Sequence, residues 1–372
     1  NALKSFANII SIGKINIAKI LQDLLRFISV WFQIEDNKII NDINENYINK
    51  TIPLESWLFI IPQLLARLNI KNKNLRNSLI NLIKKLSEQY PSALVTLLIV
   101  VKNSSINTLR SDAAKNILKE LEEKKKSFID QSEDLVNELN RLALLIYEKW
   151  NNGIEESAEL LYEEYDIEGM ISKLYELHAI MNKKPNSITE KHFHHLYRSE
   201  LKIAKQYIED YEKYKKNGEN FVNDLSYIHR AWDIYYKIFL SIKDNFYTET
   251  ENKIISMINV SPVLANFRDS EINIIGFQRN DINEKIKIIG FKKELIILKS
   301  KQRPKKITIY GSDEKEYIYL LKANEDLRQD ERAIQLFDLV NSLLKLDVDT
   351  YGKKLFIKGY PILALSNNTG VI

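Results

Sequence analysis

Cysteine is absent from this 372-residue chain, and glycine is scarce. Without cysteine there is no disulfide framework, no Cys-ligated zinc, no iron–sulfur cluster and no cysteine nucleophile. A reducing compartment therefore suits the chain best. The 10 glycines form neither a GxGxxG motif nor a P-loop, so both common glycine-rich phosphate sites are excluded.

Long hydrophobic runs and an excess of one charge are also missing. The longest apolar run extends from Ala93 to Val101, far short of the ~20 residues that a membrane-spanning helix needs. Lys and Arg number 54 against 50 Asp and Glu, and a net charge of +4 excludes a strongly basic nucleic-acid binder and an acidic tail. No signal peptide opens the chain, which begins with asparagine, so we expect a piece of a longer protein.

Apolar residues are plentiful, at 45% of the chain, and they predict two or three domains with real cores. Residues 1–145 show helical periodicity, with apolar residues at spacings of three and four. The first such stripe comprises Ile17, Ile20, Leu21, Leu24, Leu25, Phe27, Ile28 and Trp31. Further stripes run through 57–68, 75–86 and 94–101, and short polar turns between them are typical of an α-solenoid.

The next hundred residues predict a compact four-helix bundle. Pro185 breaks one helical pattern, and Asn217-Gly218 marks a further turn. The expected helices span 146–165, 168–182, 188–216 and 220–243.

After about residue 266 the apolar period changes from 3.6 to 2, which predicts short strands. The expected strands are 272–275, 285–289, 295–299, 307–310, 316–322, 355–357 and 361–365. One amphipathic helix interrupts them, with an expected apolar face of Ala333, Leu336, Phe337, Val340, Leu343 and Leu344. The fold class is therefore mostly α: solenoid helices, then a four-helix bundle, then a small α+β layer of twisted antiparallel sheet and one helix.

Lys322 is the most informative single residue for chemistry. Alternation places it at the end of a strand on the same face as Ile318 and Leu320, and Asp330 falls in the first turn of the following helix. A strand lysine facing a helix carboxylate is how kinase N-lobes hold ATP phosphates. The alternative is a lysine that merely ends the strand in water, and spacing alone favours that alternative.

Other motifs of catalysis or metal binding are incomplete. His229-Arg230-Ala231 lacks the aspartate of a kinase catalytic loop and lies in the middle of a predicted helix, and no Asp-Phe-Gly occurs. The histidines at 192, 194 and 195 have no distant third ligand, so we interpret them as a solvated helix start and expect no metal site.

The predicted helix 220–243 carries two apolar stripes. One is a core face of Ile228, Ala231, Tyr235, Ile238 and Ile242. Trp232, Tyr236 and Phe239 form the second, aromatic stripe. If that stripe is a binding surface, Trp232 is exposed to solvent while Tyr235 and Ile238 are buried; the alternative is a helix buried on both sides.

Several motifs together resemble the phosphatidylinositol-3-kinase-related protein kinases. Residues 300–306 (Ser-Lys-Gln-Arg-Pro-Lys-Lys) and 321–332 (Leu-Lys-Ala-Asn-Glu-Asp-Leu-Arg-Gln-Asp-Glu-Arg) are similar to the N-lobe of that family. Residues 153–156, 177–179 and 231–236 (Ala-Trp-Asp-Ile-Tyr-Tyr) resemble the rapamycin-binding bundle of its target of rapamycin (TOR) branch, and 57–68 resembles the end of its FAT domain.

The resemblance implies a domain order and an activity. Residues 1–145 would be the C-terminal part of the FAT helical repeats, 146–246 the rapamycin-binding bundle, 247–271 a linker and 272–372 the kinase N-lobe, with the C-lobe absent. The parent would be a Ser/Thr protein kinase of nutrient and growth signalling that uses ATP and Mg²⁺, while this chain, without a catalytic loop, would be inactive alone. The alternatives are a non-catalytic helical scaffold or a DNA-damage kinase of the same superfamily.

Site residues follow from the resemblance by position. The ATP-binding residues would be Ser300, Gln302, Pro304, Lys322, Glu325, Asp330, Tyr360 and Ile372. The rapamycin and substrate groove would comprise Ile154, Ala158, Leu161, Tyr162, His229, Trp232, Asp233, Tyr236 and Phe239. Ala158, Leu161, Glu163 and His229 replace the Ser, Tyr, Gly and Thr usual in the family, so we expect weakened rapamycin binding.

The implied partners are an immunophilin–rapamycin complex, protein substrates and the scaffold subunits of a TOR complex, with no nucleic acid and no transmembrane segment. The implied location is the cytoplasm, with peripheral attachment to endomembranes through partners.

Overall fold

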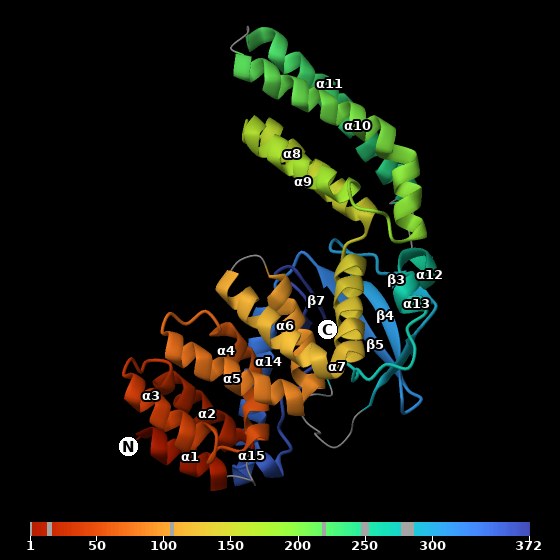
Figure 1. Ribbon diagram of the computed structural model, residues 1–372. Coiled ribbons are helices and arrows are strands. Elements are labelled where there is room, and N and C mark those ends of the chain that lie inside the picture. The colour runs from red at the N-terminus through yellow and green to blue at the C-terminus, as the bar shows by residue number, and fades with distance from the viewer. Residues whose placement is uncertain (1, 13–16, 105–107, 218–220, 247–252, 277–285) are drawn as a thin grey trace. The chain divides into compact units, whose positions relative to one another are not determined.

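The protein is described by a computed structural model that covers residues 2–12, 17–104, 108–217, 221–246, 253–276 and 286–372 (Figure 1). It divides into two compact units, each built from segments that are separate in sequence. Unit 1 comprises residues 1–140, 267–291 and 308–372, and unit 2 comprises residues 141–266 and 292–307. In the covered ranges no helix is both long and apolar enough to cross a membrane.

Unit 1 begins with a succession of helices around a core that contains Trp31 and Trp57. Their bounds are α1 (Ala2–Ile12), α2 (Ile17–Trp31), α3 (Asn37–Ile43), η1 (Asn44–Ile48), η2 (Leu54–Ile60), α4 (Ile61–Ala66), α5 (Lys73–Gln89), α6 (Pro91–Asn103) and α7 (Thr108–Ala143). Phe27, Trp31 and Trp57 are fully buried, and the Trp57 ring lies 5.9 Å from that of Phe27. Pro91 starts α6, where its missing N–H costs nothing. The predicted helical part is confirmed.

The helical stripe predicted over 57–68 is divided between two helices. The chain forms the 3-10 helix η2 up to Ile60 and then restarts as α4, with Pro62 in the first turn. Proline has no N–H to donate to the preceding turn and its ring clashes with the carbonyl four residues back, so the two segments cannot merge into one helix.

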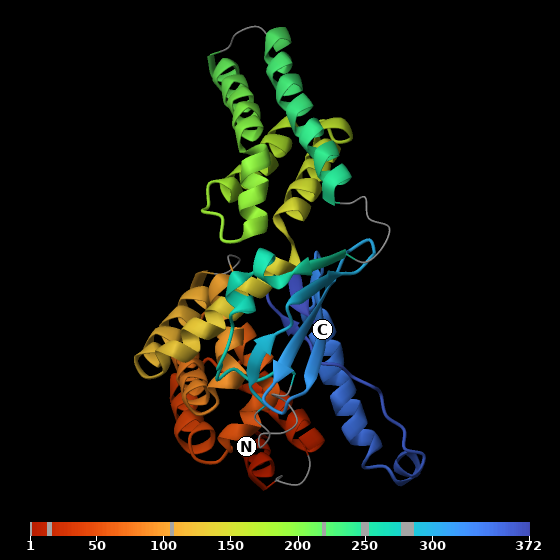
Figure 2. The same ribbon diagram turned by 90° about the vertical axis from the view of Figure 1, so that its right-hand side faces the viewer.

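The remainder of unit 1 is a mixed layer of strands and one long helix (Figure 2). Its elements are β2 (Ile288–Phe291), the later part of β4 (Lys305–Gly311), β5 (Glu316–Ala323), β6 (Leu363–Ala364), β7 (Thr369–Val371), α14 (Arg328–Leu344) and α15 (Val348–Gly352). All the pairings are antiparallel: β2 with β4, β5 with β7, and β7 with β6. The hairpin expected between β4 and β5 is present, with Gly311 N–H donating to the Lys315 carbonyl.

Three sequence expectations in this layer need correction. Residues 272–275 form one isolated bridge at Asn273 instead of a strand, and 355–357 are irregular. Residues 272–274 pair with 286–288 through only two backbone hydrogen bonds, from Ile274 N–H to the Ile286 carbonyl and from Ile288 N–H to the Ile272 carbonyl. In 355–357, the Leu355 and Ile357 N–H groups donate to the Thr350 carbonyl and the Asn341 side chain instead of to a neighbouring strand. The expected strand 361–365 is reduced to β6, and Lys285 lies outside the described residues.

The buried side of α14 also differs from the expected apolar face. Ile334 is buried against Leu327 and Ile362, with Phe337 packed beside them, whereas Leu336 and Leu343 are exposed. The helix is also held at Gln335, whose side-chain amide donates to the Phe59 carbonyl at 2.8 Å. This contact to η2 fixes the rotation of α14 about its axis.

Unit 2 contains the helical bundle and a small sheet. The bundle helices are α8 (Ile146–Tyr162), α9 (Ile167–Met181), α10 (Ile188–Asn217) and α11 (Phe221–Phe246), within three residues of each predicted bound. Helices α10 and α11 pack together along their length (Figures 1 and 2). The predicted turn at Gly218 lies outside the described residues. The other elements are β1 (Lys253–Ser256), α12 (Met257–Val260), α13 (Pro262–Ala265), β3 (Glu294–Ile297) and the start of β4, paired in the order β1, β3, β4.

Candidate functional site

Lys322 lies on β5 with its ammonium paired to a carboxylate. The burial pattern of β5 alternates as predicted, with Tyr319 and Leu321 on the buried face. Lys322 Nζ lies 3.0 Å from Glu325 Oε2, and the two side chains are 28% and 34% exposed. Asn324 has a φ of 61°, a left-handed turn that returns the chain so that Glu325 faces the strand.

The expected partnership of Lys322 with Asp330 is not formed. Asp330 lies in the first turn of α14 as predicted, but its side chain is exposed, and the carboxylate at Lys322 is that of Glu325. The physical reason is reach: Glu325 is three residues from Lys322 across a tight turn, whereas Asp330 is on a helix that turns its first residues to solvent.

Ile372 lies on the same face of the sheet as Lys322. Its N–H donates to the Leu320 carbonyl at 2.9 Å and its carbonyl accepts from Leu320 N–H at 2.9 Å, so Ile372 is directly opposite Leu320. Residues opposite each other in an antiparallel pair share a face, and Leu320 and Lys322 share theirs by alternation. The Ile372 side chain packs against the core that anchors α14. The structure therefore brings Lys322, Glu325 and Ile372 together.

Tyr360, expected at the same site, lines a different cavity of about 300 Å³ in unit 1. The wall of this cavity includes Ile61 and Leu97 of the helical repeats and Glu331 of α14, but not Lys322 or Ile372.

The remaining residues expected at the ATP site form a loop in unit 2. Leu298 N–H donates to the Pro304 carbonyl at 2.9 Å, and Arg303 N–H donates to the Ser300 carbonyl at 3.2 Å. These bonds close the loop on itself, with Arg303 at a φ of 45°. Ser300 and Gln302 are exposed and Pro304 is partly buried. Residues 298–304 therefore form one closed loop, the 298–304 loop.

The residues expected to form the rapamycin groove gather on α8 and α11 of the bundle. The Tyr162 ring meets the Trp232 ring edge-on at 5.7 Å, and the Tyr236 and Phe239 rings lie 6.3 Å apart. Of the others, Ile154 is buried, Ala158 and Leu161 are partly buried, and His229 and Asp233 are exposed. Burial, and then the Asp233 charge, raise the pKa of the Tyr162 phenol.

Trp232 does not have the exposure that a binding stripe of Trp232, Tyr236 and Phe239 would require. Trp232 is 9% exposed because Tyr162 covers its ring, whereas Tyr236 is 50% exposed. Tyr235 and Ile238 are buried as predicted. Of the three aromatic residues in this stripe, Tyr236 is therefore the most exposed.

Comparisons with known proteins match both helical parts. Residues 138–244 match the family described as FKBP12-rapamycin binding domain, and residues 38–143 match the family described as Serine/threonine-protein kinase ATR-like, HEAT repeats. The chain is 34% identical over 359 residues to Serine/threonine-protein kinase TOR of Arabidopsis thaliana, covering 95% of this chain. It is 35% identical over 373 residues to Serine/threonine-protein kinase mTor of Drosophila melanogaster, covering 100% of this chain.

The chain belongs to the target of rapamycin (TOR) family. It spans 14% of the length of these TOR relatives. A DNA-dependent protein kinase catalytic subunit of Gallus gallus is 41% identical, but over 23% of this chain, whereas the two TOR relatives match 95% and 100% of it. Among solved structures, "Structure of the open conformation of CtTel1" covers 95% of this chain and 11% of that chain with a TM-score of 0.58 at 18% identity, which is a likeness of fold.

Two polar features of this TOR-family chain were missed from the sequence. Lys305 is buried at the start of β4 and contacts Glu148 of α8, and His178 of α9 is buried against Tyr235 of α11. Lys305 alternates with the buried Ile307 and Ile309, so period-2 analysis extended by two residues would have placed it in the core.

In the ranges that the structure describes, no group of three His, Cys, Asp or Glu side chains is placed to hold a metal ion. His192 Nδ1 instead lies 2.8 Å from the Tyr147 hydroxyl.

Proposed function

We propose that this chain carries the N-lobe part of the ATP site of a Ser/Thr protein kinase that transfers the γ-phosphoryl group to protein Ser/Thr in nutrient and growth signalling. The observation that carries this proposal is the Lys322–Glu325 pair at 3.0 Å on a strand face shared with Ile372. The TOR relatives of Arabidopsis thaliana and Drosophila melanogaster are named as Ser/Thr protein kinases, which supports it.

Each residue of the site has a proposed role. The Lys322 ammonium would bind the ATP phosphates, where a fixed positive charge stabilises the charge that builds up during phosphoryl transfer. Glu325 would orient Lys322, Ile372 would contact the adenine, and the 298–304 loop, with Ser300, Gln302 and Pro304, would lie over the phosphates. ATP and Mg²⁺ are the implied substrate and metal, the latter held by residues outside this chain. Tyr360, which lines the cavity of about 300 Å³, is proposed as a further adenine contact.

The domain order is also part of the proposal. We assign residues 1–145 to the end of the FAT repeats, 146–246 to the rapamycin-binding bundle, 247–271 to a linker and 272–372 to the kinase N-lobe, in a protein that works in the cytoplasm with complex subunits as partners. The match over 138–244 supports the second assignment.

Replacing Lys322 in the intact parent kinase tests the activity. Lys322→Met removes the charge and keeps the length of the stem, so kcat/KM should fall by about 10²-fold or more. Lys315→Met, in the exposed turn of the same hairpin, is the matched control and should keep wild-type activity. If Lys322→Met has near-normal activity, Lys322 is an ordinary surface lysine. If the wild-type parent does not bind ATP, the result favours a non-catalytic helical scaffold.

The bundle is proposed to bind an immunophilin–rapamycin complex, and its exposed aromatic surface supports this. Tyr236→Ala should weaken that binding about 10-fold or more, as for an aromatic interface residue, while the neighbouring exposed Lys237→Ala should not. Calorimetry with the preformed immunophilin–rapamycin complex measures both, and an absence of heat from the folded wild-type chain would reject the ligand.

A further inference from the structure

A buried ion pair joins the first bundle helix of unit 2 to the strand that follows the 298–304 loop. Lys305 Nζ lies 2.5 Å from Glu148 Oε2 and donates a hydrogen bond of 2.8 Å to the Ala143 carbonyl. Both residues are almost fully buried, Lys305 with 1% and Glu148 with 4% of the side chain exposed. The same Glu148 oxygen accepts the N–H of Leu145 at 2.9 Å, so it also caps the start of α8.

Such a pair is not explained by stability alone. Moving an ammonium and a carboxylate out of water costs about as much as their attraction returns, and apolar residues of similar volume often stabilise a core equally well. Burial lowers the pKa of Lys305, and Glu148 opposes this shift. The pair does fix the position of the Lys305 side chain, because its ammonium is held by both a carboxylate and a carbonyl.

Lys305 is the residue at which the 298–304 loop enters the sheet. It directly follows Pro304, whose carbonyl closes the loop by accepting from Leu298 N–H, and it is paired in register with Ile297 of β3. The loop base is therefore held in two directions. The backbone pairing of β3 with β4 fixes it within the sheet, and the Lys305 side chain fixes it to α8 and to the end of α7.

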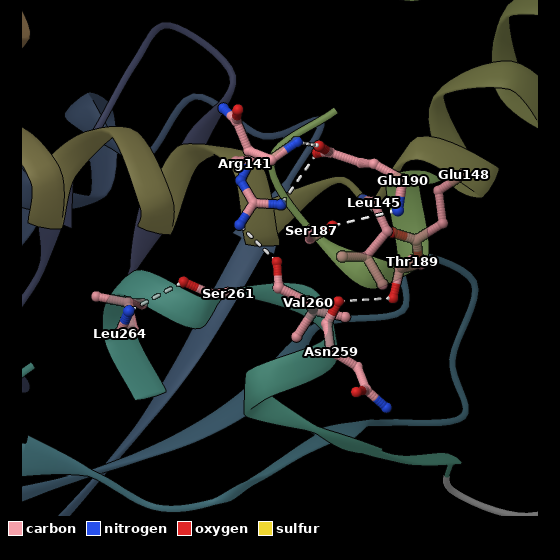
Figure 3. A network of polar contacts seen from close by, with 11 residues as sticks. Arg141, Leu145, Glu148, Ser187, Thr189, Glu190, Asn259, Val260, Ser261 and Leu264 are labelled. Carbon is pink, nitrogen blue, oxygen red and sulfur yellow. Dashed lines mark hydrogen bonds and ion pairs between the residues drawn. The ribbon is translucent and has the colours of Figure 1, made fainter. Parts of the chain in front are cut away.

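A second polar cluster holds the same end of the bundle (Figure 3). Arg141 Nη1 lies 3.0 Å from Glu190 Oε1 at the start of α10, and Arg141 Nη2 donates to the Val260 carbonyl of α12. Thr189 Oγ1 donates to the Asn259 carbonyl at 3.1 Å. These contacts fix the start of α10 and the end of α7 within unit 2, and the Ala143 carbonyl that accepts from Lys305 lies at that end of α7.

We infer that Lys305 and Glu148 are positioning residues that hold the 298–304 loop, through the base of the rapamycin-binding bundle, in the place where it receives the ATP phosphates. This inference rests on the proposed kinase function and adds a role for two residues that contact no substrate. It predicts that loss of the pair weakens ATP binding more than it weakens binding of the protein substrate.

The test uses the intact parent kinase with Lys305→Met, Lys305→Arg and the control Lys306→Met. Lys306 is the next residue of β4 and loses the same charge without a contact to Glu148. Lys305→Met should raise KM for ATP about 10-fold while KM for the peptide stays within about twofold, because the proposed role of the loop is toward the nucleotide and not the peptide. Lys305→Arg keeps the charge and the donors and should restore most of the ATP affinity, and Lys306→Met should match wild type.

Hydrogen–deuterium exchange of residues 298–304 in the same variants gives a readout that does not depend on activity. Exchange of the loop should rise in Lys305→Met and stay at the wild-type rate in Lys306→Met. If Lys305→Met fails to fold, the neutral double variant Lys305→Met/Glu148→Gln removes the unpaired buried charge and is measured instead, with the same expectations.

The outcomes separate this inference from the function on which it rests. An inactive wild-type parent would reject the kinase proposal, and loop exchange would still decide the positioning role. If the wild-type parent is active, the decisive comparison is between Lys305→Met, or the double variant, and Lys306→Met. Equal KM values for ATP and equal exchange rates of the loop in these variants would overturn the inference.

Discussion

His178 is a buried histidine that the bundle keeps neutral. Its Nε2 lies 2.7 Å from the Tyr235 hydroxyl, and its ring meets Trp150 edge-on at 5.6 Å. Burial, and then the Lys205 charge, lower the pKa of His178 to about 4, while Glu209 acts in the opposite direction. A neutral imidazole and a phenol can form one hydrogen bond with each other while both remain uncharged. No charge then has to be buried among apolar side chains.

This pKa predicts that the protein loses stability in mild acid. The unfolded chain takes up the His178 proton near pH 6.5, whereas the folded chain resists it down to about pH 4. Stability from this residue is therefore complete above pH 6.5 and is lost as the pH falls toward 4, by up to roughly 3 kcal/mol. Urea unfolding at a series of pH values measures the loss.

His178→Gln is the control for that measurement. Glutamine stays neutral at every pH and can accept from Tyr235, so the variant should be less stable at pH 7 but should show a flatter decline in acid. An NMR titration of the His178 ring with a midpoint near 6.5 would contradict the prediction.

At the scale of elements, β7 is positioned by one glycine opposite the proposed phosphate lysine. Gly370 pairs with Lys322, and a Cβ at Gly370 would lie 2.6 Å from Leu327 Cδ1 and 2.8 Å from the Leu363 carbonyl oxygen. Leu327 is buried in the core beneath α14. The close approach of β6, β7 and the start of α14 therefore depends on the missing side chain.

Gly370→Ala should consequently destabilise unit 1 by about 1–3 kcal/mol, the usual cost of overpacking. Gly352→Ala in α15 is the matched control, because a Cβ there meets no atom within 4 Å, and it should change stability by less than about 1 kcal/mol, in the favourable direction. Urea unfolding of both variants gives the two numbers, and equal values would show that β7 has room for a methyl group.

At the scale of the whole molecule, both compact units are assembled from separate stretches of chain. Strand β4 begins in unit 2 and ends in unit 1, and α7 likewise passes from one unit to the other. A cut between the bundle and the strands in sequence would therefore not yield two intact units. Experiments on the ATP site need the full 372 residues or the parent protein.

The chain by itself should transfer no phosphate. Its 372 residues contain neither a His-Arg-Asp catalytic loop nor an Asp-Phe-Gly motif, and phosphoryl transfer requires both the base and the metal ligands that these motifs supply. Radiolabelled ATP with a panel of Ser/Thr peptides should give no product with the purified chain. Turnover that persists after removal of every contaminating kinase would show that other residues can replace these motifs.

The sequence by itself determined the order of the helices and strands along the chain and the position of Lys322 on a strand. Helical spacing of apolar residues placed α8 to α11 to within a few positions, and alternation placed Lys322 at the end of a strand. These signals are reliable because periodicity is local: each is generated by the geometry of one element and can be read in a short window.

Only the tertiary structure decided which side chains contact one another. The structure pairs Lys322 with Glu325 instead of Asp330, places Tyr162 against Trp232, and leaves 355–357 irregular. Each of these outcomes depends on which distant residues the folded chain brings close. The Lys305–Glu148 pair joins residues 157 positions apart, and no local pattern couples such positions. Burial and pairing are properties of the packed chain, since a side chain is desolvated only when distant elements close over it.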